Sequence, residues 1–144
     1  MANNKNIKIK NYSPLRYPGG KVKLYPLVSS LIKKSNIKHT VYIEPFAGGA
    51  GLALSLLYNN DVDEIVINDY DKAVYSMWRA ILTQSQRFIQ LIQDTPVTIE
   101  EWYHQKNIYL TQKDRYSLEL GFATFYLNRA NRSGIITAGP IGGY

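Results

Sequence analysis

Two short β-branched runs, each followed directly by residues that end a strand, constrain the fold of this chain most. Residues 41–43 lead into a glycine-rich stretch at residues 46–51, and residues 64–67 lead into Asn68 and Asp69. Apolar residues at helical spacing follow each of these turns. The order strand, glycine loop, helix, strand, acid, helix is typical of a right-handed βαβ unit with parallel strands. The sequence therefore predicts an α/β fold.

The second half of the sequence has a different, mainly helical pattern. Residues 84–93 have helical spacing, a Thr98-x-x-Glu101 capping box predicts the start of another helix that runs to about Lys113, and residues 118–125 predict a third. The last stretch, residues 128–144, contains four glycines and one proline. It fits either a hairpin or an irregular loop.

The composition excludes several classes of protein. The 144 residues contain no cysteine, so neither a disulfide framework nor a thiolate metal site is possible, and the two histidines stand 65 residues apart. We therefore expect no metal. No apolar run approaches the roughly 20 residues of a membrane span, and the chain begins with polar residues, so we expect a cytoplasmic protein with no membrane partner.

The positive charge is concentrated near the N-terminus. Residues 1–40 hold nine of the 17 basic residues and no acidic residue, whereas residues 61–71 hold five of the 11 acidic residues. Near the C-terminus, residues 120–144 carry Arg129 and Arg132 as their only charged side chains. Basic ends favour a polyanionic partner, because binding to phosphates releases counterions. A merely solvated, lysine-rich surface is the alternative.

The glycine loop and Asp69 together indicate a nucleoside ligand. Asp69 follows Gly48 by 21 residues and directly follows the second strand, where a carboxylate can accept hydrogen bonds from ribose hydroxyls. The dinucleotide fingerprint fails because Leu54 stands where a glycine or alanine is needed, and no phosphate-binding loop of the triphosphatase type is present. S-adenosylmethionine is the remaining common ligand. We expect its adenosyl group between the backbone near Gly48 and the Asp69 carboxylate.

Three motifs, in their order along the chain, resemble the opening motifs of the Dam-like (D12 class) adenine-specific DNA methyltransferases. They are Tyr17-Pro-Gly-Gly-Lys21, Glu44-Pro-Phe-Ala-Gly-Gly49 and Ile67-Asn-Asp-Tyr-Asp71. The resemblance implies an incomplete Rossmann-like S-adenosylmethionine-dependent methyltransferase core at residues 13–83, after a disordered basic arm at residues 1–12. It further implies a helical insertion, with the start of a DNA target-recognition region, at residues 84–144.

The resemblance also assigns the site residues. The Tyr17 ring and Lys21 would flank the methionine end of S-adenosylmethionine, Phe46 and Gly48 would form the floor, and Asp69 would bind the ribose. The full set of expected cofactor-binding residues is Tyr17, Gly19, Gly20, Lys21, Glu44, Phe46, Gly48 and Asp69. Those expected near duplex DNA are Arg129, Asn131, Arg132 and Ser133. The family pattern has a glycine at position 50, where this chain has Ala50.

The resemblance further implies a catalytic tetrad, Asp/Asn-Pro-Pro-aromatic, that orients the exocyclic amine of a flipped adenine. No two of the six prolines are adjacent, so the tetrad is not in this sequence and no catalytic residue is assigned. The expected function is thus adenine-N6 methylation of DNA by a truncated or split chain that is inactive alone, its sheet completed by a second polypeptide or a second copy. The alternatives are a non-catalytic module that binds S-adenosylmethionine or DNA, and a fragment of a nucleotide-dependent oxidoreductase, which Leu54 disfavours.

Overall fold

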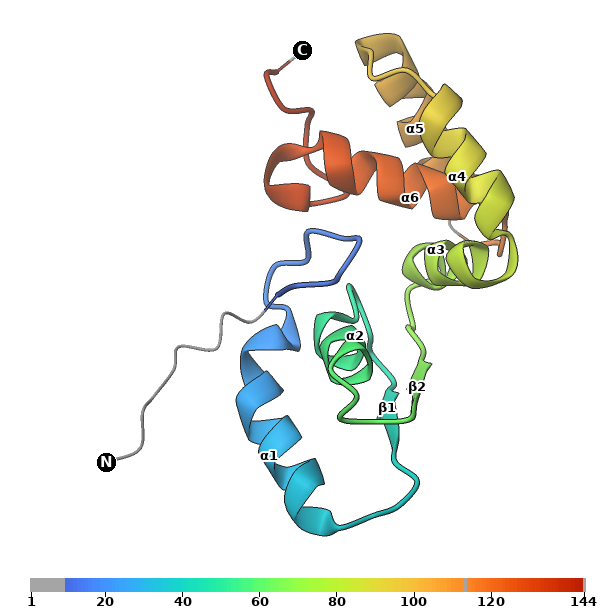
Figure 1. The fold of residues 1–144 in the computed structure, drawn as a ribbon. Helices are drawn as coiled ribbons and strands as arrows, with labels where there is room; N and C mark the ends of the chain where they lie inside the picture. The colour runs from blue at the N-terminus through green and yellow to red at the C-terminus, as the bar shows by residue number, and fades with distance from the viewer. Residues whose placement is uncertain (1–9, 113, 144) are drawn as a thin grey trace.

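The computed structural model describes residues 10–112 and 114–143, and over these residues it has two β-strands and six α-helices (Figure 1). Two short 3-10 helices are labelled η. In chain order the elements are η1 (Lys21–Leu24), α1 (Tyr25–Ser35), β1 (Val41–Glu44), α2 (Gly51–Tyr58), β2 (Glu64–Ile67), α3 (Lys72–Thr83), α4 (Ser85–Asp94), α5 (Ile99–Gln112), α6 (Leu118–Ala130) and η2 (Arg132–Gly134).

The two strands form the parallel pair that the sequence predicts. β1 and β2 are in register from Val41 opposite Glu64 to Glu44 opposite Ile67, and α2 is the crossover between them. Because both strands run the same way, the residues that follow Glu44 and Ile67 meet at one end of the sheet. The glycine loop and Asp69 are therefore brought to the same edge by the topology alone.

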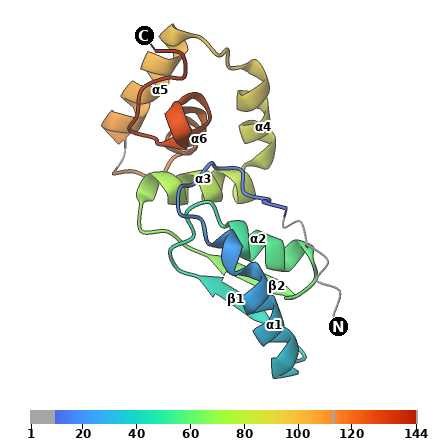
Figure 2. The ribbon, with the colours of Figure 1, turned by 90° about the vertical axis from the view of Figure 1, so that its left-hand side faces the viewer.

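Helices cover one face of this sheet. α1 and α2 lie on the same side of the strands (Figures 1 and 2), and Tyr42 and Ile65 pack toward α2. The alternate side chains on the other face, Val41, Ile43 and Val66, are exposed, with Ile43 61% exposed. Parallel sheets normally bury both faces. This open apolar face is the least complete part of the described fold.

The helical half is joined to the sheet half through α3. One continuous core cluster includes Ala53 of α2, Met77 of α3 and Phe122 of α6. α3 and α6 approach closely at Gly121, where a Cβ atom would stand 2.6 Å from the backbone oxygen of Ser76. The division at residues 83 and 84 thus falls within a shared core, and it remains a proposal.

The helix-start signals in the sequence are confirmed. The Asp71 carboxylate accepts hydrogen bonds from the backbone of Ala73 and Val74 at the start of α3, and the Thr98 hydroxyl accepts one from the Glu101 backbone at the start of α5. The Glu101 carboxylate does not complete the box; it accepts a hydrogen bond from Gln105 instead.

The two ends of the chain differ from the sequence expectation in detail. The expected disordered arm at residues 1–12 lies mostly outside the described residues, but residues 10–12 are described, and the Tyr12 ring stacks on Tyr58 with centroids 4.6 Å apart. Of the two alternatives for residues 128–144, the structure shows an irregular loop with η2 and one antiparallel bridge, Asn131 to Pro140. No helix in the described part of the chain is both long and apolar enough to cross a membrane.

Candidate functional site

Asp69 turns toward the glycine loop, as the sequence analysis requires. Its Oδ2 accepts a hydrogen bond from the Gly48 backbone N–H at 2.7 Å, and its Oδ1 accepts one from the Asp71 backbone N–H at 3.0 Å. The residue is only partly buried, and a carboxylate oxygen can accept more than one hydrogen bond. A ligand hydroxyl can thus donate to Asp69 from outside. It cannot lie between Asp69 and Gly48, because these groups are in direct contact, and the expected position of the adenosyl group is corrected accordingly.

A cavity of about 250 Å³ lies beside Asp69, between the end of β2 and α3. Trp78 lines this cavity, and its indole N–H donates to the Gly48 carbonyl at 2.7 Å, which ties the glycine turn to α3. The lining residues are Ile67, Asn68, Asp69, Tyr75, Trp78, Arg79, Leu82 and Thr83. The cavity combines apolar walls with one carboxylate, which suits a ring system carrying hydroxyl donors.

Lys21 links the start of η1 to the end of β1. Its ammonium donates to Glu44 Oε1 at 2.9 Å and to the Phe46 carbonyl at 2.6 Å. Glu44 is only 3% exposed, and its Oε2 also accepts from the Ala53 backbone N–H near the start of α2. Within the described residues Lys21 therefore uses two of its three N–H donors, and the third can bind an anionic ligand group.

Tyr17 packs directly on the glycine turn. Residues 17–20 form a turn in which Gly19 has a φ of 75° and Gly20 N–H donates to the Tyr17 carbonyl. A Cβ atom at Gly48, where φ is 48°, would stand 2.9 Å from two atoms of the Tyr17 ring. Burial, followed by the Asp69 and Asp71 carboxylates, raises the pKa of the Tyr17 hydroxyl. The structure thus brings Tyr17, Gly48 and Asp69 together.

At the other loop glycines, Gly49 and Gly51, the side on which a Cβ atom would stand faces the N-terminal segment of the chain. A Cβ atom at Gly49 would meet Ser13 Oγ, and one at Gly51 would stand 3.0 Å from Asn11 Oδ1. The cavity between residues 11–22 and the loop measures only about 50 Å³. The N-terminal segment therefore occupies the space beside Gly49 and Gly51 and leaves little room for a ligand on that side of the loop.

Two further loop residues, Ala50 and Phe46, differ from what the family resemblance implies. Ala50 adopts a left-handed conformation, with φ 47° and ψ 29°, at the position where the family pattern has glycine. This conformation costs a non-glycine residue about 1–2 kcal/mol. Phe46 is 69% exposed, so it presents a surface ring and not the floor of a closed pocket.

The residues expected near DNA divide into two groups. Arg129, Arg132 and Ser133 are exposed. Asn131 is fully buried: its Oδ1 accepts from the Trp102 indole at 2.6 Å, and its amide nitrogen donates to the carbonyls of Ile135 and Ile136. These bonds use the amide internally, so Asn131 positions the loop and is not available to DNA.

Sequence reasoning missed Asn128, which ties the segment before η1 to the loop after α6. Its side chain exchanges hydrogen bonds with the backbone N–H and C=O of Arg16, each at 2.9 Å, and donates to the Gly134 carbonyl at 2.6 Å. The segment before η1 therefore lies beside the loop that contains η2 (Figure 1), which brings the exposed Arg16 to the same region as Arg132. Asn128 lies beyond the helix that the sequence predicts at residues 118–125, and its burial is seen only because α6 continues to Ala130.

A short parallel βαβ unit with an acidic residue bound to the glycine turn, joined to several helices, defines an α/β protein with a candidate ligand site at the carboxyl ends of its strands. Within the described residues, no group of three or more His, Cys, Asp or Glu side chains could hold a metal ion.

The chain belongs to the D12 class N6 adenine-specific DNA methyltransferase family, whose family model matches residues 17–144. Comparison with curated proteins gave no match. Family membership implies S-adenosylmethionine as methyl donor and DNA as substrate.

Proposed function

We propose that this chain supplies the S-adenosylmethionine site and part of the DNA-binding surface of an adenine-N6 DNA methyltransferase with a Rossmann-like core. The observation that carries the proposal is the hydrogen bond from Gly48 N–H to Asp69, because it fixes a partly exposed carboxylate at the carboxyl end of the parallel strands. That is the place where this fold class binds nucleosides. Family membership supplies the reaction.

The donor and acceptor groups of the site fit the cofactor. A ribose carries two hydroxyl donors, and Asp69 retains acceptor capacity on the side of the cavity of about 250 Å³. Three carboxylates, Glu44, Asp69 and Asp71, lie near this end of the sheet, against two cations, Lys21, which pairs with Glu44, and Arg79, which lines the cavity. The surplus of negative charge favours a cationic sulfonium. When bound, S-adenosylmethionine supplies an activated methyl group.

The segment from Tyr17 to Lys21 is suited to hold the amino-acid end of the cofactor. The third N–H of Lys21 is placed to bind a carboxylate, and the Tyr17 hydroxyl, a phenol that is protonated at neutral pH even at its ordinary pKa, can donate a hydrogen bond. Gly19 and Gly20 shape the turn between them. In this proposal the protein's residues bind and orient the cofactor, and none of them acts as a nucleophile.

The DNA surface is proposed to consist of Arg129, Arg132, Ser133 and, through the Asn128 bonds, Arg16. Guanidinium groups bind phosphates or guanine edges, and a serine hydroxyl binds phosphates. Asn131 acts only by holding the loop that carries Arg132. We also propose a cytoplasmic location, as expected from the sequence.

The chain alone is proposed to bind but not to methylate. Its sequence lacks the Asp/Asn-Pro-Pro-aromatic tetrad. The exposed face of Val41, Ile43 and Val66 leaves the sheet uncovered within the described residues, so we propose that a second polypeptide or a second copy covers it. A non-catalytic binding module is the alternative function, and it makes the same binding predictions.

Calorimetric titration and a methyl-transfer assay test these proposals. We expect S-adenosylmethionine to bind and NAD not to bind, whereas tight NAD binding would favour an oxidoreductase fragment. Incubation with labelled S-adenosylmethionine and adenine-containing duplex DNA is expected to give no labelled DNA with this chain alone. Labelled DNA formed by the pure chain would contradict the proposed need for a second component.

A further inference from the structure

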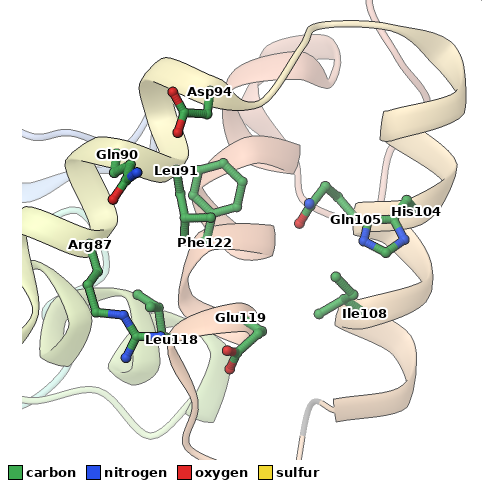
Figure 3. Close-up of a pocket in the computed structure, with 10 residues that line it drawn as sticks. All are labelled: Arg87, Gln90, Leu91, Asp94, His104, Gln105, Ile108, Leu118, Glu119 and Phe122. Atoms are coloured by element: carbon green, nitrogen blue, oxygen red, sulfur yellow. The ribbon is translucent and has the colours of Figure 1, made fainter.

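The helical half contains a second cavity, of about 370 Å³, between α4, α5 and α6 (Figure 3). It shares no lining residue with the two cavities near the glycine loop. Its volume lies within the range of small-molecule sites in proteins. The lining residues are Arg87, Gln90, Leu91, Asp94, His104, Gln105, Ile108, Leu118, Glu119 and Phe122.

One buried polar group in this cavity lacks a partner. Gln105 is 5% exposed, and its Oε1 makes no hydrogen bond within the described part of the chain. Its amide nitrogen donates to Glu101 Oε1 at 2.6 Å, which fixes the amide orientation because a carboxylate only accepts. Figure 3 shows the amide end of Gln105 extending from α5 toward Leu91 and Phe122. A buried acceptor without a donor is costly, so a ligand donor at this point would be favourable.

The surroundings of Gln105 define the rest of the ligand. Leu91, Ile108 and Phe122 offer apolar walls to a ring or a short hydrocarbon body. Among the exposed charged groups of the lining, the carboxylates of Asp94 and Glu119 outnumber the guanidinium of Arg87, which donates to the Gln84 side chain at 3.2 Å; the lining also includes the imidazole of His104. This balance disfavours phosphate and favours a cation.

We propose that this cavity binds a small organic amine or amidine. An N–H group of the ligand donates to Gln105 Oε1, its apolar body packs against Leu91 and Phe122, and its positive charge lies near Asp94 and Glu119. The site is separate from the proposed S-adenosylmethionine and DNA sites, and it does not depend on either of them.

Benzamidinium is the probe for this site, because it joins an apolar ring to a planar cation with several N–H donors. Benzoate is the matched control compound, with the same shape, the opposite charge and no donor. We would titrate each into the ¹⁵N-labelled full chain and follow amide shifts by two-dimensional NMR. Gln105→Leu removes the acceptor while keeping an apolar wall, and Gln93→Leu is the matched control at an exposed position of α4.

The expected result is saturable benzamidinium shifts confined to the residues around the cavity, with a Kd of about 1 mM or tighter. Gln105→Leu should weaken binding about tenfold, which corresponds to one hydrogen bond, and Gln93→Leu should leave the Kd unchanged. Benzoate should cause no saturable shift.

Three results would overturn the proposal: no saturable benzamidinium shift up to about 10 mM, equal shifts with benzoate, or equal Kd values for Gln105→Leu and the wild type. The first two need no variant, so a poorly folded Gln105→Leu protein would not leave the proposal untested.

Discussion

The glycine turn with Asp69 and the C-terminal end of α6 with its following loop both contain buried or partly buried polar side chains, but they use those side chains differently. Asn128 near the end of α6 and Asn131 directly after the helix are buried and bonded to backbone or indole groups of the same chain. At the glycine turn, Asp69 is only partly buried and Lys21 keeps a donor. The contrast shows that remaining hydrogen-bond capacity, more than residue type, separates a binding group from a structural one.

The largest loss of stability is expected when the internal hydrogen bonds of the loop after α6 are removed. Asn131→Ala removes the acceptor of the Trp102 indole and the donor to Ile135 and Ile136, so it should lower the free energy of unfolding by about 3 kcal/mol. Urea denaturation measures this change. The exposed Asn107→Ala in α5 is the matched control, expected within about 0.5 kcal/mol of the wild type. Equal stability of the two variants would show that Asn131 is not a structural group.

The second-largest loss of stability is expected from Gly48→Ala, which tests how tightly the glycine turn is packed. Gly48→Ala combines a φ of 48° with a contact to the Tyr17 ring, so a stability loss of about 2–3 kcal/mol is expected. Gly142 also has a positive φ, of 92°, but open space around it. The stability loss of Gly142→Ala therefore measures the backbone cost alone. In a Tyr17→Ala background, Gly48→Ala should cost less stability, because the part of the loss caused by the contact with the ring is then absent. Thermal or urea unfolding measures this difference. An equal stability loss from Gly48→Ala in the wild type and in the Tyr17→Ala background would argue against the Tyr17 contact.

A smaller, pH-dependent effect is expected at the ion pair between α1 and the loop before β2. The Lys33 ammonium lies 2.8 Å from Asp61 Oδ1. Burial raises the pKa of Asp61, but the hydrogen bond from Lys33 and those from the Tyr25 and Ser29 hydroxyls outweigh it, so the pKa lies below its ordinary value. The resulting stabilisation is complete above the unfolded-state pKa of about 3.9 and is lost as the pH falls through the lower folded-state pKa.

Asp61→Asn tests this linkage. The variant should be less stable than the wild type by about 1 kcal/mol at pH 7, and the difference should shrink below about pH 4. Urea denaturation across this pH range measures it, with the exposed Asp114→Asn as the control. A difference that stays constant with pH would contradict the assignment.

The smallest effect on stability, and a specific effect on binding, is expected at Arg132. Arg132→Ala should leave unfolding unchanged and should lower the slope of log K against log salt for duplex DNA by about 0.9, the value for one phosphate contact. Fluorescence anisotropy at several salt concentrations measures the slope. Arg115→Ala, in the exposed turn before α6, is the control. Identical slopes for both variants would remove Arg132 from the DNA surface.

Local features of the fold could be predicted from the sequence because their causes are local. The Asp71 and Thr98 caps depend on side chains within three residues of the backbone they bind, and the parallel strand pair follows from two β-branched runs and a helical crossover. The meeting of Asp69 and Gly48 follows from that topology.

Other features depend on contacts that no local pattern encodes. The burial of Asn131 depends on Trp102, 29 residues away, and the covering of Gly49 by Ser13 depends on how the N-terminal segment folds back. The unpaired Gln105 oxygen arises only once α4, α5 and α6 surround it. Each of these is a consequence of tertiary packing.

The central claim is that Asp69 is a ligand-binding carboxylate, and calorimetric titration of S-adenosylmethionine into paired variants tests it most directly. Asp69→Ala is compared with Asp114→Ala, which loses the same charge at an exposed position, and with Asp69→Asn, which keeps an oxygen for the Gly48 N–H. We expect the Kd to rise at least about tenfold for Asp69→Ala, by a smaller factor for Asp69→Asn, and not at all for Asp114→Ala. An unchanged Kd in a folded Asp69→Ala protein would contradict the account.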